Sequence, residues 1–134
     1  MSSGTQRGFQ WALLVTAGLV IVGVFLQVYF IAAYTFGASE DALDAHTGLG
    51  GVVHLLEVLA FIAALVAYWK AWGKVAPAFA LAVVGTLQLG FADADEWVAG
   101  FHGLLALVVL ILAHAVVQRT VRDLGLGRHG AGTD

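Results

Sequence analysis

Residues 8–39, GFQWALLVTAGLVIVGVFLQVYFIAAYTFGAS, contain no Asp, Glu, Lys or Arg. A helix that crosses a bilayer needs roughly 20 predominantly apolar residues. Three more apolar stretches follow, and the four predicted spans cover residues 10–36, 47–69, 75–91 and 97–117. The chain is 60% apolar and 11% charged, whereas a soluble domain carries about 25% charged residues. The sequence therefore predicts an all-α integral membrane protein, in which residues 1–134 form one four-helix up-down-up-down bundle.

The basic and acidic residues are found at opposite ends of the predicted spans. All Lys and Arg residues fall before the first span, between the second and third, or after the fourth, namely Arg7, Lys70, Lys74, Arg119, Arg122 and Arg128. Acidic clusters occupy the two opposite links, at residues 40–44 and 93–96. Because short cationic loops stay in the cytoplasm, we expect a multi-pass plasma-membrane protein with both termini inside. The first apolar run is longer than the core of a signal peptide, so we expect it to remain a span.

Local patterns predict where the helices begin. Ser39 is a suitable N-cap for the second span, and residues 93–96 (DADE) have the spacing of a capping box for the fourth. Pro77 is expected in the first turn of the third span, where its missing N–H costs little. A histidine and glycines near the start of the second and fourth spans indicate a weak two-helix repeat.

Polar side chains inside a membrane are costly and mark candidate functional sites. In this chain they are His46, His54, Glu57, His102 and His114, accompanied by Gln27 and Gln88. Most of them fall in the outer halves of the spans. We therefore expect a polar site near the outer leaflet.

His46 and His102 are predicted to lie at one depth. His46 follows Ser39 by seven residues and His102 follows Asp93 by nine, a mismatch of roughly 3 Å at about 1.5 Å per residue. Their spans run in the same direction. Two imidazoles at one level on two helices of a bundle are suited to be the axial ligands of a b-type haem.

A haem also needs room beside its ligands. Gly50 lies one turn after His46, and Gly103 directly follows His102. Their missing side chains would admit a flat macrocycle, and they would equally serve plain helix packing. We expect one haem b held by these four residues.

A second haem or metal site is less favoured. It would need His54 and His114, whose depths differ by six residues, or roughly 9 Å. His114 is better explained as an interfacial histidine near the cytoplasmic end, and His129 as a solvated residue of the tail.

Glu57 lies one turn after His54 on the same helix face. This pair could carry a proton or bind the hydroxyl of a quinol, which makes both residues candidates for the catalytic role. The alternative is a structural hydrogen bond. A di-iron site would need repeated Glu-x-x-His pairs, and the chain has one His-x-x-Glu. A Cu or Zn site built from His46, His54, His102 and Asp44 is a further hypothesis.

The sequence resembles one four-helix half of haem A synthase-like membrane haem proteins. The matching stretches are residues 44–48 (DAHTG) and 101–105 (FHGLL), which carry His46 and His102. The sequence also resembles uncharacterised four-span bacterial membrane families. In that comparison Gln27, His54 and Gln88 match in addition to His46 and His102. The resemblance implies that the two histidines ligate haem iron. In haem A synthases the first histidine follows a glutamate and precedes an arginine. In this chain Asp44 lies two residues before His46, and Thr47 follows it directly. The resemblance therefore supports haem binding better than haem-modifying activity.

The favoured hypothesis is a small membrane cytochrome of b type, an electron carrier or oxidoreductase that exchanges electrons with a partner such as a quinol. The alternatives are a cofactor-free structural subunit of a larger membrane complex, and a Cu- or Zn-handling protein that uses the histidine cluster. Membrane lipid is an expected partner in each case, and self-association into a homo-oligomer is compatible with all three. The absence of cysteine excludes covalent haem attachment and thiolate metal sites. Nothing in the charge pattern indicates nucleic acid binding.

Overall fold

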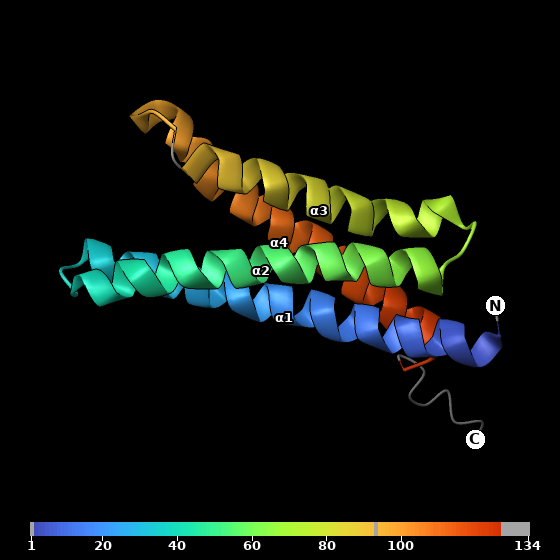
Figure 1. Ribbon diagram of the computed structural model, residues 1–134. Helices are drawn as coiled ribbons and strands as arrows, with labels where there is room; N and C mark the ends of the chain where they lie inside the picture. The colour runs from blue at the N-terminus through green and yellow to red at the C-terminus, as the bar shows by residue number, and fades with distance from the viewer. Residues whose placement is uncertain (1, 93, 127–134) are drawn as a thin grey trace, which may run out of the picture.

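The computed structural model describes residues 2–92 and 94–126, and every regular element in this part of the chain is an α-helix. The four helices are α1 (Ser3–Thr35), α2 (Glu40–Ala67), α3 (Trp72–Ala92) and α4 (Glu96–Leu124). Successive helices run in opposite directions and lie side by side along one long axis (Figure 1). The predicted all-α four-helix fold is confirmed.

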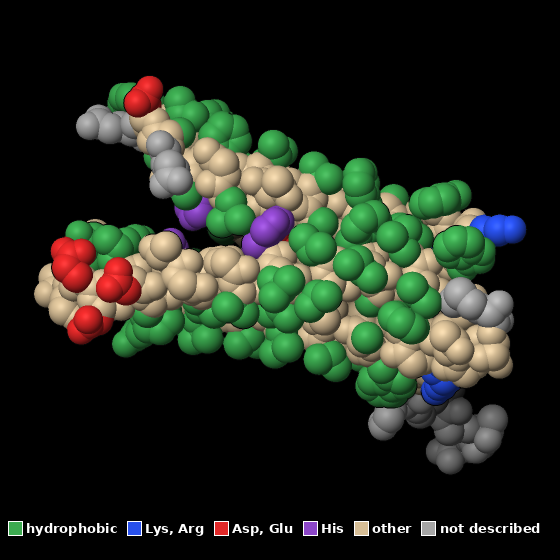
Figure 2. Space-filling model, viewed as in Figure 1, with side chains coloured by type: hydrophobic (Ala, Val, Ile, Leu, Met, Phe, Trp, Pro, Cys, Tyr) green, Lys and Arg blue, Asp and Glu red, His purple; other side chains and the backbone are tan. Residues whose placement is uncertain are grey.

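Each of the four helices is long and apolar enough to cross a membrane. Their outward faces carry large apolar side chains that are well exposed, among them Phe25 at 64% and Ile111 at 68%. Apolar side chains cover the visible sides of the molecule between its two ends (Figure 2). Such a surface is what lipid would solvate, because hydrocarbon makes no demand for polar groups on the outside.

The helix ends extend beyond the predicted spans at several points. Ser39 is the N-cap of α2, as predicted, but its hydroxyl bonds to Asp41 and not to the helix backbone. The N-cap of α4 is Asp95, with no side-chain capping bond. The capping box predicted at residues 93–96 is therefore not the start of this helix. Its first residue, Asp93, lies outside the described residues, as do Arg128 and His129.

The prediction that Pro77 lies in the first turn of its helix is wrong. α3 begins at Trp72, so Pro77 is its sixth residue. A proline there lacks the N–H that would bond the carbonyl four residues earlier. That carbonyl belongs to Gly73, and the Arg119 guanidinium donates to it at 2.8 Å. A cationic side chain from α4 thus replaces the missing backbone donor.

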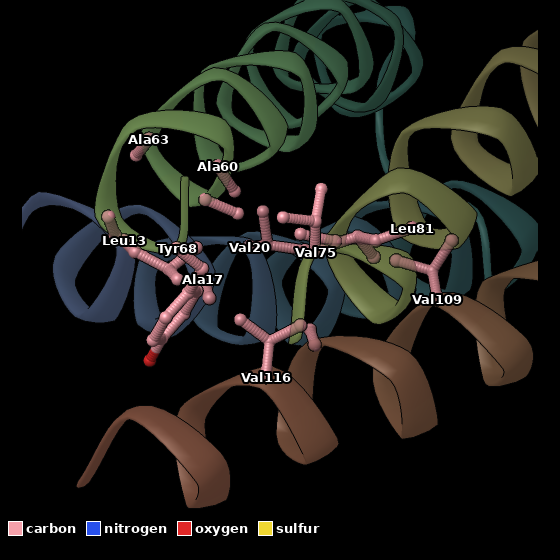
Figure 3. Close-up of a cluster of buried hydrophobic side chains, with 14 of the residues drawn as sticks. Leu13, Ala17, Val20, Ala60, Ala63, Tyr68, Val75, Leu81, Val109 and Val116 are labelled. Atoms are coloured by element: carbon pink, nitrogen blue, oxygen red, sulfur yellow. The ribbon is translucent and has the colours of Figure 1, made fainter. Parts of the chain in front are cut away.

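The bundle consists of two helical hairpins, α1/α2 and α3/α4, that pack through α1 against α4 and α2 against α3. Among the described residues, the diagonal pairs α1/α3 and α2/α4 nowhere approach within 8 Å between Cα atoms. Small residues allow the close packing: a Cβ at Gly23 would overlap the Val53 side chain, so this glycine lets α1 and α2 meet. The core is rich in alanine and valine from all four helices (Figure 3).

The core fills only one half of the bundle. Its residues end at Val24 on α1, begin at Val53 on α2, end at Gly85 on α3 and begin at Val109 on α4. Beyond this level no residue of the described outer turns is buried. The hairpins separate there and leave an open wedge, whose mouth lies at the end with the acidic links (Figures 1 and 2).

The two ends of the bundle differ in charge. Acidic side chains gather at the mouth of the wedge, and Lys and Arg side chains lie at the closed end (Figure 2). Glu40, Asp41 and Asp44 belong to the first turns of α2, whereas Lys74 lies near the start of α3 and Arg119 near the end of α4. At the closed end the Lys74 ammonium pairs with Asp123 at 3.0 Å. This ion pair joins the start of α3 to the end of α4.

Leu81→Ala should destabilise the bundle by about 2 kcal/mol or more, because it opens a cavity at a fully buried core position. The matched control is Leu87→Ala on the same helix, where the side chain is 51% exposed. Unfolding in mixed micelles with increasing SDS measures both. Equal losses in the two variants would contradict the core described above.

Candidate functional site

His46 and His102 meet inside the wedge, on the diagonally opposed helices α2 and α4. Each is the seventh residue of its helix, since 46 − 40 and 102 − 96 both equal six. The depth mismatch expected from the sequence therefore disappears. Their ring centres are 6.1 Å apart, with an angle of 64° between the ring planes. The predicted pairing of these two side chains is present in the structure.

Each of these rings is held by a main-chain carbonyl of the preceding helix. His46 Nδ1 lies 3.0 Å from the Gln27 carbonyl oxygen, and His102 Nδ1 lies 2.9 Å from that of Gln88. A helical carbonyl has a second lone pair that can accept such a bond. Because a carbonyl can only accept, Nδ1 must carry the hydrogen in both rings. In the neutral imidazole the lone pair is then on Nε2.

The Nε2 atoms of the two rings have no hydrogen-bond partner among the described residues. This combination, with Nδ1–H on a carbonyl and Nε2 free, is the usual state of a metal-ligating histidine. The two hairpins repeat it: a glutamine carbonyl on the first helix orients a histidine on the second. The sequence indicated this repeat only weakly.

A cavity of about 140 Å³ lies between the hairpins and opens into the wedge. Histidine side chains are visible in the opening (Figure 2). The polar and glycine residues of its wall are Gln27, His46, Gly50, His54, Glu57, Gly85, Gln88, His102 and Gly103, and the rest of the wall is apolar. These polar positions, which are scattered over four helices in the sequence, therefore line one continuous cavity.

The predicted glycines have different roles. A Cβ at Gly50 would lie 2.9 Å from Gln27 Nε2, so this glycine makes room for the glutamine side chain. A Cβ at Gly103 would meet nothing within 4 Å. Gly103 therefore leaves open space next to His102. Gln27 Oε1 is fully buried and has no hydrogen-bond partner among the described residues.

Glu57 and His54 form the floor of the cavity, where the packed half of the bundle begins. His54 Nδ1 hydrogen-bonds to Glu57 Oε2 at 3.1 Å, as expected from their spacing. The Glu57 residue is only 1% exposed. Its carboxyl group lies against Gly85 of α3, at a point that any side chain on that residue would occupy. Gly85 is not predictable from the sequence, because no pattern along α3 indicates which side chain faces it.

His54 and His114 do not come together. His54 lines the cavity, whereas His114 is exposed and is not part of the cavity wall. Over residues 2–92 and 94–126, no group of three or more His, Cys, Asp or Glu side chains could hold a metal ion. The four side chains of the hypothesised Cu or Zn site, His46, His54, His102 and Asp44, therefore do not form such a cluster.

No protein-family model matches the chain, and no curated protein or solved structure matches it either. The resemblance to haem A synthase-like proteins thus stays a resemblance of short motifs, and the geometry of the site carries the functional argument.

Gly85→Ala should destabilise the protein by about 1–3 kcal/mol, because the new methyl group would overlap Glu57 Oε2 and force the carboxyl away from His54. Gly90→Ala on the same helix is the matched control, since a Cβ there meets nothing within 4 Å. Alanine also favours a helix over glycine, so the control should be neutral or stabilised. SDS unfolding of the two variants compares them, and a loss of similar size in both would refute the close packing of Glu57 on Gly85.

Proposed function

We propose that this protein is a small membrane cytochrome of b type that holds one haem between His46 and His102. The observation that carries the proposal is the pair of imidazoles on the diagonally opposed helices α2 and α4. In each ring Nδ1–H donates to a main-chain carbonyl, and Nε2 is left free to bind a metal. Gly103 and the open wedge provide space between the two hairpins for a flat group.

The distance between the rings supports a shared ligand. The ring centres of His46 and His102 are 6.1 Å apart, close enough for both rings to bind one metal ion such as the iron of a haem. A haem needs only two protein ligands, which agrees with the lack of a larger ligand cluster in the described residues.

A bound haem supplies one-electron redox chemistry. The residues of this chain supply the rest. The Gln27 and Gln88 carbonyls fix the orientation of the rings and raise the basicity of Nε2. The apolar part of the wall lowers the local dielectric constant, which tunes a redox potential.

The absorption spectrum of the protein, purified after expression with added haem precursor, tests the proposal. We expect about one haem per chain, with a Soret band and a sharp α band on reduction by dithionite. His46→Ala and His102→Ala should each lose the haem, because one axial ligand is missing. His114→Ala should retain it, since that side chain lies outside the cavity.

Two other results would replace the proposal. Bound Cu or Zn without haem, measured by elemental analysis, would favour the metal-handling alternative. Neither haem nor metal would favour a cofactor-free subunit of a larger complex. Loss of haem in His114→Ala, with retention in His46→Ala, would mean that another pair of residues ligates the iron.

We further propose that the protein lies in the plasma membrane with both termini in the cytoplasm, so that the wedge opens towards the outer face. The support is the position of Lys and Arg side chains at the closed end and of acidic side chains at the mouth (Figure 2).

Because the chain has no cysteine, single cysteines can report this orientation. Ala38→Cys and Ala71→Cys place the same residue in the α1–α2 and α2–α3 links. We expect a membrane-impermeant maleimide to label residue 38 in intact cells, and residue 71 only after the membrane is permeabilised. The reverse pattern would invert the orientation.

A further inference from the structure

The floor of the cavity carries a carboxyl group, that of Glu57, of which only one oxygen atom forms a hydrogen bond to the protein. Glu57 Oε2 is hydrogen-bonded to His54 Nδ1 at 3.1 Å, whereas Glu57 Oε1 forms no hydrogen bond to another described residue. The residue is 1% exposed, and it lines the cavity. A carboxyl oxygen on a cavity wall that has no protein partner is available to a ligand.

This polar floor is separate from the proposed haem level. His54 follows His46 by eight residues on the same helix, which corresponds to about 12 Å along the axis. His54 Nε2 also has no partner in the described part of the chain. The floor thus offers an acceptor on Glu57 and a further ring nitrogen on His54, below the two facing imidazoles.

The cavity suits a ligand that arrives from the lipid. Val28, Leu89 and Leu107 line it and are also 39–57% exposed on the apolar surface of the bundle. Its wall is therefore continuous with the surface that hydrocarbon would cover.

From these observations we infer that the cavity floor binds the head group of a lipid-soluble quinol, with a ring hydroxyl donating to Glu57 Oε1. The inference rests on the proposed cytochrome function and names the class of its reduced partner. An apolar ring and tail match the wall, and a hydroxyl donor matches the unpartnered oxygen.

Binding to the full chain in lipid nanodiscs tests the site. The probes are decyl-benzoquinol, kept reduced under argon, and its dimethyl ether, which has the same ring and tail but no hydroxyl donor. Titration calorimetry against empty nanodiscs separates binding from partition into lipid. We expect the wild-type protein to bind the quinol about tenfold more tightly than the ether, since only the quinol donates to a carboxyl group.

Glu57→Gln is nearly isosteric and should reduce this preference to about threefold or less. Glu40→Gln is the matched control, because Glu40 is exposed and lies outside the cavity wall, and it should keep the wild-type preference. Equal binding of quinol and ether by the wild-type protein would overturn the inference. An unchanged preference in Glu57→Gln would overturn it as well.

The absorption spectrum of each sample separates the two proposals. Haem with no quinol preference would leave the cytochrome proposal standing and remove the quinol site. A Glu57-dependent preference without haem would do the opposite: the binding site would stand, and the cytochrome would not.

Discussion

The hydrogen bonds from His46 and His102 to main-chain carbonyls are the constraint on which the site depends. Each bond satisfies the only donor of a neutral imidazole and leaves its lone pair on Nε2. It also fixes the ring against rotation, since the acceptor is part of a helix backbone. The partner carbonyl always lies on the neighbouring helix of the same hairpin. A hairpin therefore positions its own histidine, and the two hairpins need only be placed correctly against each other.

That placement comes from the opposite half of the bundle. Small residues let α1 meet α2 at Gly23 and Val53, and the core of alanines and valines joins both hairpins below the cavity. Above Glu57 the packing stops and the hairpins diverge. The packed half thus acts as a rigid base, and the open half can present polar groups without closing on them. Association in a membrane depends on such close packing, because lipid tails provide no hydrophobic driving force between helices.

Much of this arrangement could be predicted from the sequence. The uncharged runs determine the number of spans, and the residue spacing brings His46 level with His102 and His54 within reach of Glu57. The helix starts were less predictable, since α3 includes Pro77 in its second turn with the help of Arg119. The carbonyl partners were also beyond prediction, because every residue has a carbonyl and only the crossing of two helices selects one. Gly85 is similar: its role depends on Glu57, which lies on another helix.

A purely structural role explains the cavity poorly. Hydrogen bonds between helices in membranes contribute on average only about 0.6 kcal/mol. Buried ionic groups can often be replaced by well-packed apolar residues without loss of stability. Here the polar side chains line a space instead of filling it, and Gln27 Oε1 is buried without a hydrogen-bond partner among the described residues. Packing alone would be better served by apolar side chains that close the wedge. The structure instead keeps the wedge open at the level of the two ring nitrogens and the carboxyl group, and the proposed haem and quinol sites rest on this arrangement.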